Sequence, residues 1–420
     1  MKKTIVAFAV VCTLPGVLAA ADRHKTIDAE IQSLSRQLSD TRRDLHMHPE
    51  LSNREERTSK VIADRLRSLG IPIETGVAKY GVIATIKGNG PGKTAIFRAD
   101  IDALPIEETM DVPYKSLNKG VKHACGHDAH TSIALTAAEL LWKHRSEFPG
   151  TAVVLFQPAE EGPPLGEEGG AALMIKEGVL EKYKPSAMFA LHVDPAQEAG
   201  IVSWTPGSEF ASADRFYITV TGKGTHGAYP HMGIDPIVIS AEIITNLQTI
   251  ASRRIDPIEP VVVTVGAIHG GTRFNIIPDT VQMEGTIRTL SASVRDKTLG
   301  LVKSITAGIA EANGASAKVE SLLLAPITKN DEKVGLFGEK SLQTTLGPAN
   351  VLRVLPVMGA EDFGFFSDRI PSFYFKLGIA NKERGITANI HTAQFDIDEK
   401  SLLIGARAVT NLMMDYLQAK

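Results

Sequence analysis

Short apolar, strand-like runs alternate with helical patterns in the first half of the chain, and this alternation restricts the possible folds more than any other feature. The strand-like runs cover residues 82–86, 94–97, 151–156 and 187–191. Apolar residues at helical spacing cover 27–45, 53–69 and 131–148. Strands that alternate with helices are typical of layered α/β domains. We therefore predict an α/β domain with a mostly parallel central sheet flanked by helices.

The pattern changes near residue 205. The order becomes strand, helix, strand, strand, helix, strand over residues 215–221, 235–253, 261–267, 280–289, 293–312 and 317–322. This order is that of a small α+β sandwich. A strand at 372–376 and a helix at 398–418 then return to the first style. The sequence therefore predicts one domain, residues 22–208 and 325–420, interrupted by an inserted domain, residues 209–324.

The composition limits the kinds of partner. The chain has 420 residues, a formal net charge of −3 and 22% charged residues. A balance this close to neutral gives no basic surface for nucleic acid or for an anionic membrane. We expect a small-molecule or peptide substrate.

The N-terminus has the pattern of an export signal. Lys2 and Lys3 form a basic start, residues 5–18 are mostly apolar, and residues 19–21 are three alanines. A buried first helix or a membrane anchor is the alternative, but the apolar run is shorter than the ~20 residues that span a bilayer, and Pro15 interrupts it. We predict a signal peptide over residues 1–21 and an exported, periplasmic or secreted protein without a membrane span.

The expected export affects the interpretation of the two cysteines. Of the two cysteines, Cys12 lies in the expected signal, so the mature chain keeps only Cys125 and forms no internal disulfide. A lone thiol in an oxidising compartment is a liability unless something occupies it, and a metal ion would do so.

Acids and a histidine follow the apolar runs directly. Asp100 and Asp102 follow one run, Glu160 and Glu161 follow the next, and His192 follows the last. In open α/β sheets, ligands bind in the crevice beyond the carboxyl ends of the strands. We expect these side chains to share one site.

The stretch HACGHDAH, residues 123–130, concentrates possible metal ligands. Cys125 and His127 are two apart, so in an extended segment both side chains point to the same side. A thiolate, an imidazole and a carboxylate together suit zinc best, and manganese, cobalt or nickel are alternatives. The alternative reading is a helix N-terminus capped by Asp128 or Thr131. His123 and His130 are interpreted as supporting residues.

The adjacent glutamates favour hydrolysis over metal storage. Consecutive side chains at a strand end diverge, so one carboxylate can bind metal while its neighbour accepts a proton. Zinc lowers the pKa of a bound water to about 7. His192 is interpreted as a ligand or a hydrogen-bonded core residue, and spacing alone assigns no role to His391 in its polar loop.

Eight ordered motifs resemble one known family. They are RADIDALPIEE, HACGHDAH, QPAEEG, ALHVDP, GKGTHGAYPH, the pair NIIPDT and EGTIRT, MGAEDF and HTAQFDIDE. The chain resembles the metal-dependent amidohydrolases of the aminoacylase, hippurate hydrolase and auxin-conjugate hydrolase family, relatives of the dinuclear zinc carboxypeptidases. The resemblance runs from about residue 44 to the C-terminus.

The resemblance implies roles for residues of the main domain. Two divalent metal ions, zinc in the first instance, are expected at the ligands Cys125, His127, Glu161, His192 and His391. Glu160 is expected to be the general base, and Asp100 a carboxylate that orients a ligand.

The resemblance also implies roles for the inserted domain, which is expected to act as a lid or dimerisation domain of a homodimer. His226 resembles a histidine that polarises the scissile carbonyl, often from a neighbouring subunit. Asn275 and Arg288 resemble residues that hold the substrate carboxylate, for which arginine is well suited. Turn chemistry is the alternative for His226 and Asn275.

The expected activity is hydrolysis of the amide bond of N-acyl amino acids or small peptides. Deacetylation of N-acetyl-diaminopimelate or of cell-wall-derived peptides is an alternative within the same chemistry. A periplasmic binding protein without turnover is an alternative of another class, against which the intact Glu160-Glu161 pair argues. The loop GPPLGEE after Glu161 is longer than in many family members, so substrate preference should not be transferred closely.

Overall fold

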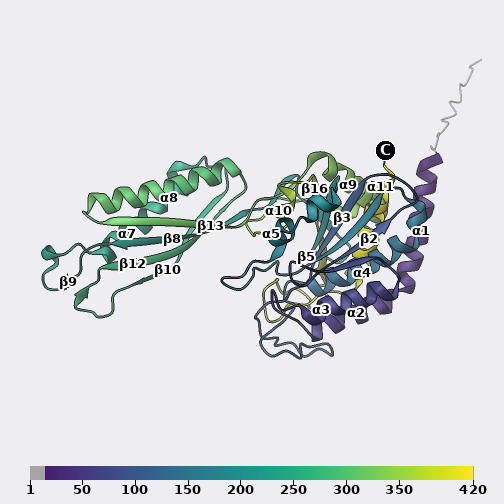
Figure 1. The fold of residues 1–420 in the computed structure, drawn as a ribbon, viewed down its shortest axis with the longest axis horizontal. Coiled ribbons are helices and arrows are strands. Elements are labelled where there is room, and N and C mark those ends of the chain that lie inside the picture. Colours follow the sequence, from purple (N-terminus) through teal and green to yellow (C-terminus); the bar gives the residue numbers. More distant parts are fainter. Residues whose placement is uncertain (1–14, 420) are drawn as a thin grey trace, which may run out of the picture.

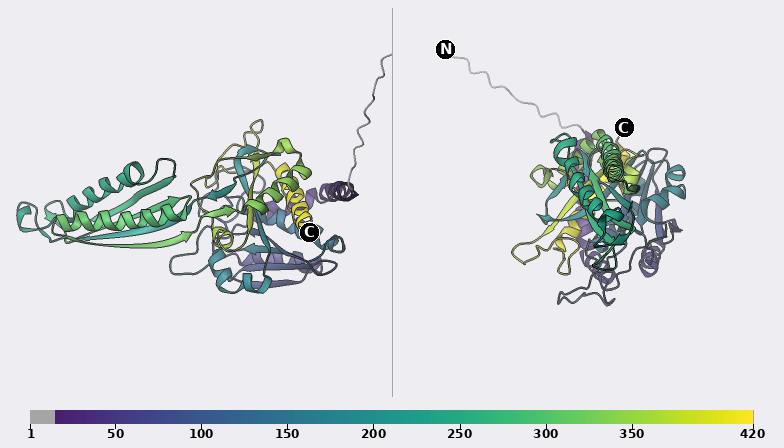
Figure 2. Two further views of the ribbon diagram at one scale, coloured as in Figure 1. Left: turned by 90° about the horizontal axis from the view of Figure 1, so that it is seen from above. Right: turned by 90° about the vertical axis from the view of Figure 1, so that its left-hand side faces the viewer.

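The structure is a computed structural model that describes the backbone of residues 15–419 and side chains from residue 23 onward. Most of the expected export signal lies outside the described residues, so that prediction stays open. The chain forms a rounded body that contains the described N- and C-terminal segments and an elongated body that extends from it (Figures 1 and 2). Among the described residues, no helix is both long and apolar enough to cross a membrane.

The rounded body is built on an eight-stranded sheet within the described residues. Its order is β1-β2-β4-β3-β5-β16-β6-β15. The strands are β1 (Ile73–Val77), β2 (Gly81–Lys87), β3 (Thr94–Asp100), β4 (Thr151–Gln157), β5 (Ala187–Glu198), β6 (Val202–Trp204), β15 (Val351–Arg353) and β16 (Ser372–Ala380). The central strands β4, β3, β5 and β16 run parallel to one another. The predicted α/β class with a mostly parallel sheet is confirmed.

Helices cover both faces of this sheet. One face packs against α1 (Pro15–Ser33), α2 (Ser35–Met47), α3 (Glu56–Ser68), α4 (His127–Lys143) and α11 (Lys400–Gln418), with α9 (Glu332–Leu346) beside them. The other face packs against α5 (Gly170–Lys176), α6 (Val179–Tyr183) and α10 (Gly364–Ser367). Val154 points into the first core, and its neighbours Val153 and Leu155 point into the second. Burial on both faces explains why these strands are continuous apolar runs rather than alternating ones.

Three predicted helices have different limits. The helix expected over 27–45 is two helices, α1 and α2, separated at Leu34. Helix α3 begins at Glu56, and its N-cap residue is Glu55, which makes no side-chain capping hydrogen bond. The expected cap, Asn53, has a left-handed backbone with φ of 60°, and its side chain donates to Glu167 and to the backbone oxygen of Glu168. The helix expected over 235–253 ends at Leu247 and is followed by a π-turn at Ile250–Arg254.

The elongated body is the inserted domain. Its antiparallel sheet has the order β10-β12-β8-β13, with β8 (Ser212–Thr221), β10 (Val261–Gly270), β12 (Thr280–Thr289) and β13 (Ser316–Ala325). Helices α7 (Pro236–Leu247) and α8 (Ala292–Ala312) pack on one face (Figure 1). Because the other face is largely exposed, β13 alternates in burial along its length. A short ladder of β9 (Thr225–His226) and β11 (Ile276–Ile277) lies at the end farthest from the rounded body (Figure 1). Another short ladder, β7 (Gly207–Phe210) with β14 (Thr328–Asn330), lies where the two bodies join.

Candidate metal centre and active site

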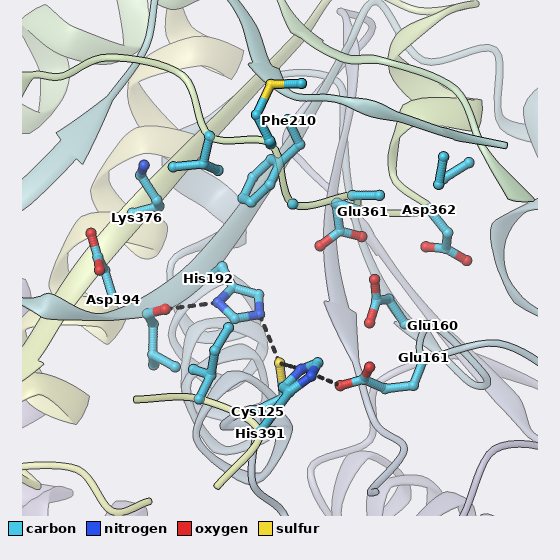
Figure 3. A pocket seen from close by; sticks show the side chains of 18 of the residues that line it. Cys125, Glu160, Glu161, His192, Asp194, Phe210, Glu361, Asp362, Lys376 and His391 are labelled. Atoms are coloured by element: carbon cyan, nitrogen blue, oxygen red, sulfur yellow. Dashed lines mark hydrogen bonds and ion pairs between the residues drawn. The ribbon is translucent and has the colours of Figure 1, made fainter. Parts of the chain in front are cut away.

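Polar side chains gather beyond the carboxyl ends of three parallel strands. Strand β3 ends at Asp100, β4 ends three residues before Glu160, and β5 contains His192. Together with Cys125 and His391, Glu160 and His192 line a cavity of about 1000 Å³ (Figure 3). The crevice at this edge of the sheet is where ligands bind in open α/β domains, as the sequence predicts.

The stretch HACGHDAH is not an extended segment. Gly126 has a left-handed backbone with φ of 91°, and His127 is the first residue of α4. A Cβ atom at Gly126 would lie 2.4 Å from Val193 Cγ2, so both the conformation and the space require glycine. The alternative of a helix N-terminus is therefore the right local structure. Neither predicted cap forms, since Asp128 instead accepts a hydrogen bond from buried Arg42 at 2.8 Å.

The five expected ligands converge. Cys125 Sγ lies 3.3 Å from His192 Nε2 and 3.2 Å from His391 Nε2. Glu161 Oε1 lies 3.3 Å from His391 Nε2 and 4.0 Å from His127 Nε2. The dashed contacts in Figure 3 follow this chain from His192 through Cys125 and His391 to Glu161. Four segments far apart in the sequence therefore present one donor set.

The donor set fits divalent cations. His127 Nε2 and Glu161 Oε1 are buried and have no hydrogen-bond partner among the described residues. Buried polar atoms are rarely left unpaired, and a cation between them would satisfy both. Two groups of three, Cys125 with His127 and His192, and Cys125 with Glu161 and His391, share the sulfur atom. The set therefore suits two ions, and the thiolate and imidazoles favour zinc.

The electrostatics agree with this fit. Burial, reinforced by Glu161 and Glu160, raises the pKa of the Cys125 thiol well above its usual range, so a thiolate here needs a cation. Burial also lowers the pKa of His192 to about 3, which keeps the imidazole neutral, as a ligand must be. Burial acts in the same direction on His127, but Asp100 and Asp102 outweigh it and raise its pKa to about 10. This negative field favours any bound positive charge.

Asp102, rather than Asp100, contacts Nδ1 of His127, one of the candidate ligands. The Nδ1 atom of His127 lies 2.9 Å from the backbone oxygen of Asp102 and 3.1 Å from its Oδ1. The other oxygen of Asp102 accepts a hydrogen bond from the backbone N–H of Glu161 at 3.0 Å. Asp102 thus fixes the ring of one ligand, with Nε2 facing the site, and the backbone of a second ligand.

Asp100 holds a different histidine. Its Oδ1 lies 2.5 Å from His130 Nδ1, and its Oδ2 accepts from Arg98 at 2.6 Å. His130 Nε2 in turn accepts from the backbone N–H of Val193, next to the ligand His192. The sequence assigns the orienting role to Asp100, but the carboxylate that contacts His127 Nδ1 is that of Asp102. Asp100 Oδ1 lies instead 3.7 Å from the other ring nitrogen, Nε2.

Glu160 faces the cavity from a strained turn. Ala159 before it has a left-handed backbone with φ of 53°, and its N–H donates to buried Glu55 at 2.8 Å. Such strain persists where surrounding contacts impose it, often at functional sites. Burial, together with Glu361 and Glu161, raises the pKa of Glu160 well above its ordinary value. The surroundings of Glu160 therefore favour its protonated form, which suits a group that takes up a proton during a reaction.

Glu361 and Asp362 complete the acidic side of the cavity, and sequence reasoning missed both. Arg98, fully buried in β3, donates to Glu361 at 2.9 Å and to Asp362 at 2.8 Å. With Glu160 these two acids form a further group of possible cation ligands. They lie in MGAEDF, which follows no strong strand pattern, so the strand-end argument could not find them.

The long loop after Glu161 contributes to the cavity wall. Gly162 and Pro163 line the cavity. Farther along the loop, Glu167 pairs with Arg54 at 2.7 Å and with Lys79 at 2.6 Å. The loop is therefore tied to the rounded body at its far end and shapes the site at its near end.

The three residues singled out in the inserted domain separate into two places. Arg288, near one end of β12, lines the cavity. His226 lies on β9 and Asn275 precedes β11, in the ladder at the far end of the domain. From Thr280 to Arg288 the strand spans roughly 26 Å at ~3.3 Å per residue. Within one chain, His226 and Asn275 therefore lie far from the metal ligands.

An α/β domain with a cysteine, histidine and glutamate donor set beside a free carboxylate, interrupted by an α+β insert, defines a metal-dependent hydrolase. Residues 96–415 match the model of peptidase family M20/M25/M40. The chain belongs to this family, which confirms the resemblance inferred from the motifs.

Individual proteins and a solved structure are similar to this chain over most of its length. The chain is 41% identical to thermostable carboxypeptidase 2 of Saccharolobus solfataricus, over 89% of this chain and 94% of that one. It is 37% identical to the IAA-amino acid hydrolase ILR1-like 5 of Arabidopsis thaliana, over 90% and 86% of the two chains. The structure of the YXEP protein of Bacillus subtilis, described as a dinuclear metal binding peptidase, has a TM-score of 0.81 at 33% identity and covers 93% of this chain and 100% of that chain.

Proposed function

We propose that the chain is an exported hydrolase that cleaves the amide bond of N-acyl amino acids or small peptides and releases the free amino acid. The observation that carries this proposal is that one cavity is lined by four of the five candidate ligands, by the carboxylate of Glu160 and by Arg288; the four ligands are Cys125, Glu161, His192 and His391. A cation site alone would serve binding, whereas Glu160 adds a proton acceptor and Arg288 a carboxylate holder.

The residues divide the reaction between them. Two divalent ions held by Cys125, His127, Glu161, His192 and His391 would supply Lewis-acid polarisation of the carbonyl and a water of lowered pKa. Glu160 would accept a proton from the attacking water. It would return that proton to the leaving nitrogen as the carbon–nitrogen bond breaks. Arg288 would hold the substrate carboxylate, and Asp102 would keep His127 in its binding tautomer.

One wall of the cavity is apolar. It includes Phe210, Leu324, Leu355 and Val357, of which Leu355 is largely exposed. An apolar acyl group or side chain could cover this surface and bury it from water. The wall supports a substrate that has a carboxylate at one point and an apolar group at another.

The active form is proposed to be a homodimer. His226 and Asn275 lie together at the far end of the inserted domain, beyond the reach of the cavity of the same chain. A twofold dimer places the same surface of each chain on the other, so each insert could reach the partner's cavity. The exposed Phe274 and Tyr229 near this end would be covered by such a contact.

The test of the activity is a substrate panel. Purified protein loaded with zinc or manganese should hydrolyse N-acetyl, N-benzoyl and dipeptide substrates, and a chelator should abolish the activity. Ligand binding without product under every metal would instead favour the binding-protein alternative.

Glu160→Gln tests the proton acceptor. The turnover number should fall by about 10²- to 10⁴-fold, because the amide cannot accept the proton. Metal content should stay unchanged, as measured by elemental analysis. Glu168→Gln, at an exposed glutamate of the neighbouring loop, is the matched control. A fully active Glu160→Gln variant would exclude the assigned role.

A further inference from the structure

A lysine lies in the middle of a long strand that is buried at every residue. Strand β16 has the sequence SFYFKLGIA, and every residue in it is buried. Lys376 is opposite His192 in the parallel register of β16 and β5, so both side chains lie on the same face of the sheet. Figure 3 shows the two side by side at the cavity, on the side away from Glu160 and Glu361.

A fully buried glutamate holds the lysine. Glu209 Oε1, on β7, lies 2.9 Å from Lys376 Nζ. The other oxygen of Glu209 accepts hydrogen bonds from the backbone N–H of Thr205 at 2.6 Å and from Asn330 Nδ2 at 3.2 Å. The carboxylate is therefore fixed before any substrate arrives.

Stability does not explain this pair. Burying two charges has a desolvation cost, and an apolar pair of the same volume often stabilises a protein as well or better. Every neighbour of Lys376 along β16 is buried, so the fold offers room for such a pair. A buried ion pair on a cavity wall therefore points to a role in recognition.

The ammonium group of Lys376 can donate more hydrogen bonds than Glu209 accepts. It carries three N–H groups, and Glu209 is its one ionic partner among the described residues. Among the described residues that line the cavity, Lys376 and Arg288 are the lysine and arginine side chains. Arg288 comes from the inserted domain and Lys376 from the central sheet, so the two approach the cavity from different walls.

We propose that Lys376, held by Glu209, is a specificity residue that binds a second carboxylate on the substrate, in addition to the carboxylate assigned to Arg288. The inference rests on the proposed amide hydrolysis and narrows its substrate class to N-acyl amino acids or peptides with two carboxylates. The second carboxylate could belong to the amino-acid side chain or to the end of the acyl group. A hydrogen bond between an ammonium and a carboxylate is of the strong, charge-assisted kind. A site built to make it discriminates against substrates that leave its buried donors unpaired.

Matched substrates test the proposal. One arm compares N-acetyl-glutamate with N-acetyl-glutamine and N-acetyl-norleucine, and the other compares N-succinyl-leucine with N-butanoyl-leucine. The wild type should favour the substrate with two carboxylates in one of the two arms, the one that carries the second carboxylate where Lys376 binds it. The expected preference is about ten- to hundredfold in kcat/KM, the range for a hydrogen bond to a charged group.

The variant Lys376→Met with Glu209→Gln removes both charges and leaves no unpaired carboxylate. In this double variant, the ratio of kcat/KM between the substrate with two carboxylates and its partner with one should fall to about 1, through a rise in KM for the former. The single variant Lys376→Arg, which keeps a cation, should retain part of the wild-type ratio. Lys382→Met, at an exposed lysine beyond the end of β16, is the control that keeps the wild-type ratio. Thermal melting verifies that each variant is folded.

The outcomes separate this inference from the proposed function. Equal hydrolysis of the glutamate and glutamine substrates and of the two leucine substrates, or a preference that persists in the double variant, would overturn the role of Lys376 alone. Failure to hydrolyse any amide would overturn the proposed function. Glutarate binding by calorimetry then tests Lys376 independently, because the wild type should bind glutarate more tightly than the double variant, and equal affinities would overturn the inference.

Discussion

At the scale of single residues, the sequence singles out the candidate ligands that the structure brings together, but not the side chains that support them. Cys125, His127 and Glu161 stand in motifs whose residue types already indicate metal chemistry. Asp100 is the last residue of β3 and Asp102 lies two residues farther on, so the strand-end pattern does not distinguish them. Which of them reaches His127 depends on where Gly126 places the start of α4, and spacing along the chain does not contain that information.

Asp102→Asn should weaken metal binding. The amide has one oxygen for the contacts that the two carboxylate oxygens make to His127 and to the backbone N–H of Glu161, so the ring is held mainly by the backbone oxygen of residue 102 and less firmly than before. Loss of such a support lowers metal affinity by about 10- to 100-fold. Asp100→Asn, which alters the contact to His130, should have the smaller effect. Competitive titration with a chromophoric chelator measures both, and equal losses would contradict the assignment.

At the scale of elements, the strands and helices follow from apolar patterns, because each must cover a face of a core. The segment with His391 is different, since it lies in a loop between β16 and α11. His391 itself has a left-handed backbone with φ of 61°. Buried side chains outside the loop fix it: Lys122 Nζ donates to the oxygen of Ala393 at 2.9 Å, and Arg42 donates to Asp396 at 2.9 Å. No periodic pattern predicts contacts of this kind.

Lys122→Met should therefore loosen one ion more than the other. His391 belongs to one of the two groups of ligands that share Cys125, so a displaced loop affects that group first. The variant should bind about one metal ion tightly per chain and a second one 10- to 100-fold more weakly. Elemental analysis after gel filtration measures the content. Lys119→Met, at an exposed lysine nearby, should keep the wild-type content. Two tightly bound ions in Lys122→Met would refute the positioning role.

At the scale of the whole molecule, the order of the motifs along the chain does not show how far apart they lie in space. His226, Asn275 and Arg288 occur within one predicted domain, yet the structure places the first two at one end and the third at the other. The sequence correctly predicts an insert but not its elongated shape, because length and orientation depend on how β8, β10, β12 and β13 align. That alignment places His226 and Asn275 beyond the reach of the cavity of their own chain.

Mixing two inactive variants tests the shared site. His226→Ala and Glu160→Gln should each be nearly inactive alone. After subunit exchange, half of the dimers are hybrids with one complete site of two, so activity should return to about a quarter of the wild type. No recovery, with hybrids verified by mass spectrometry of intact dimers, would mean that His226 acts within its own chain, and a fully active His226→Ala variant would exclude any role for it.

Two parts of the chain, the rounded body and the insert, form the wall of the cavity. The proposed metal ligands and Glu160 belong to the rounded body, whereas Arg288 and Leu324 belong to the strands of the insert. Part of the substrate-facing wall is therefore encoded in a different stretch of the gene from the proposed metal ligands. Substitutions at Leu324 should alter the fit of the substrate without touching the metal ligands or Glu160, so laboratory evolution towards a new substrate can begin there.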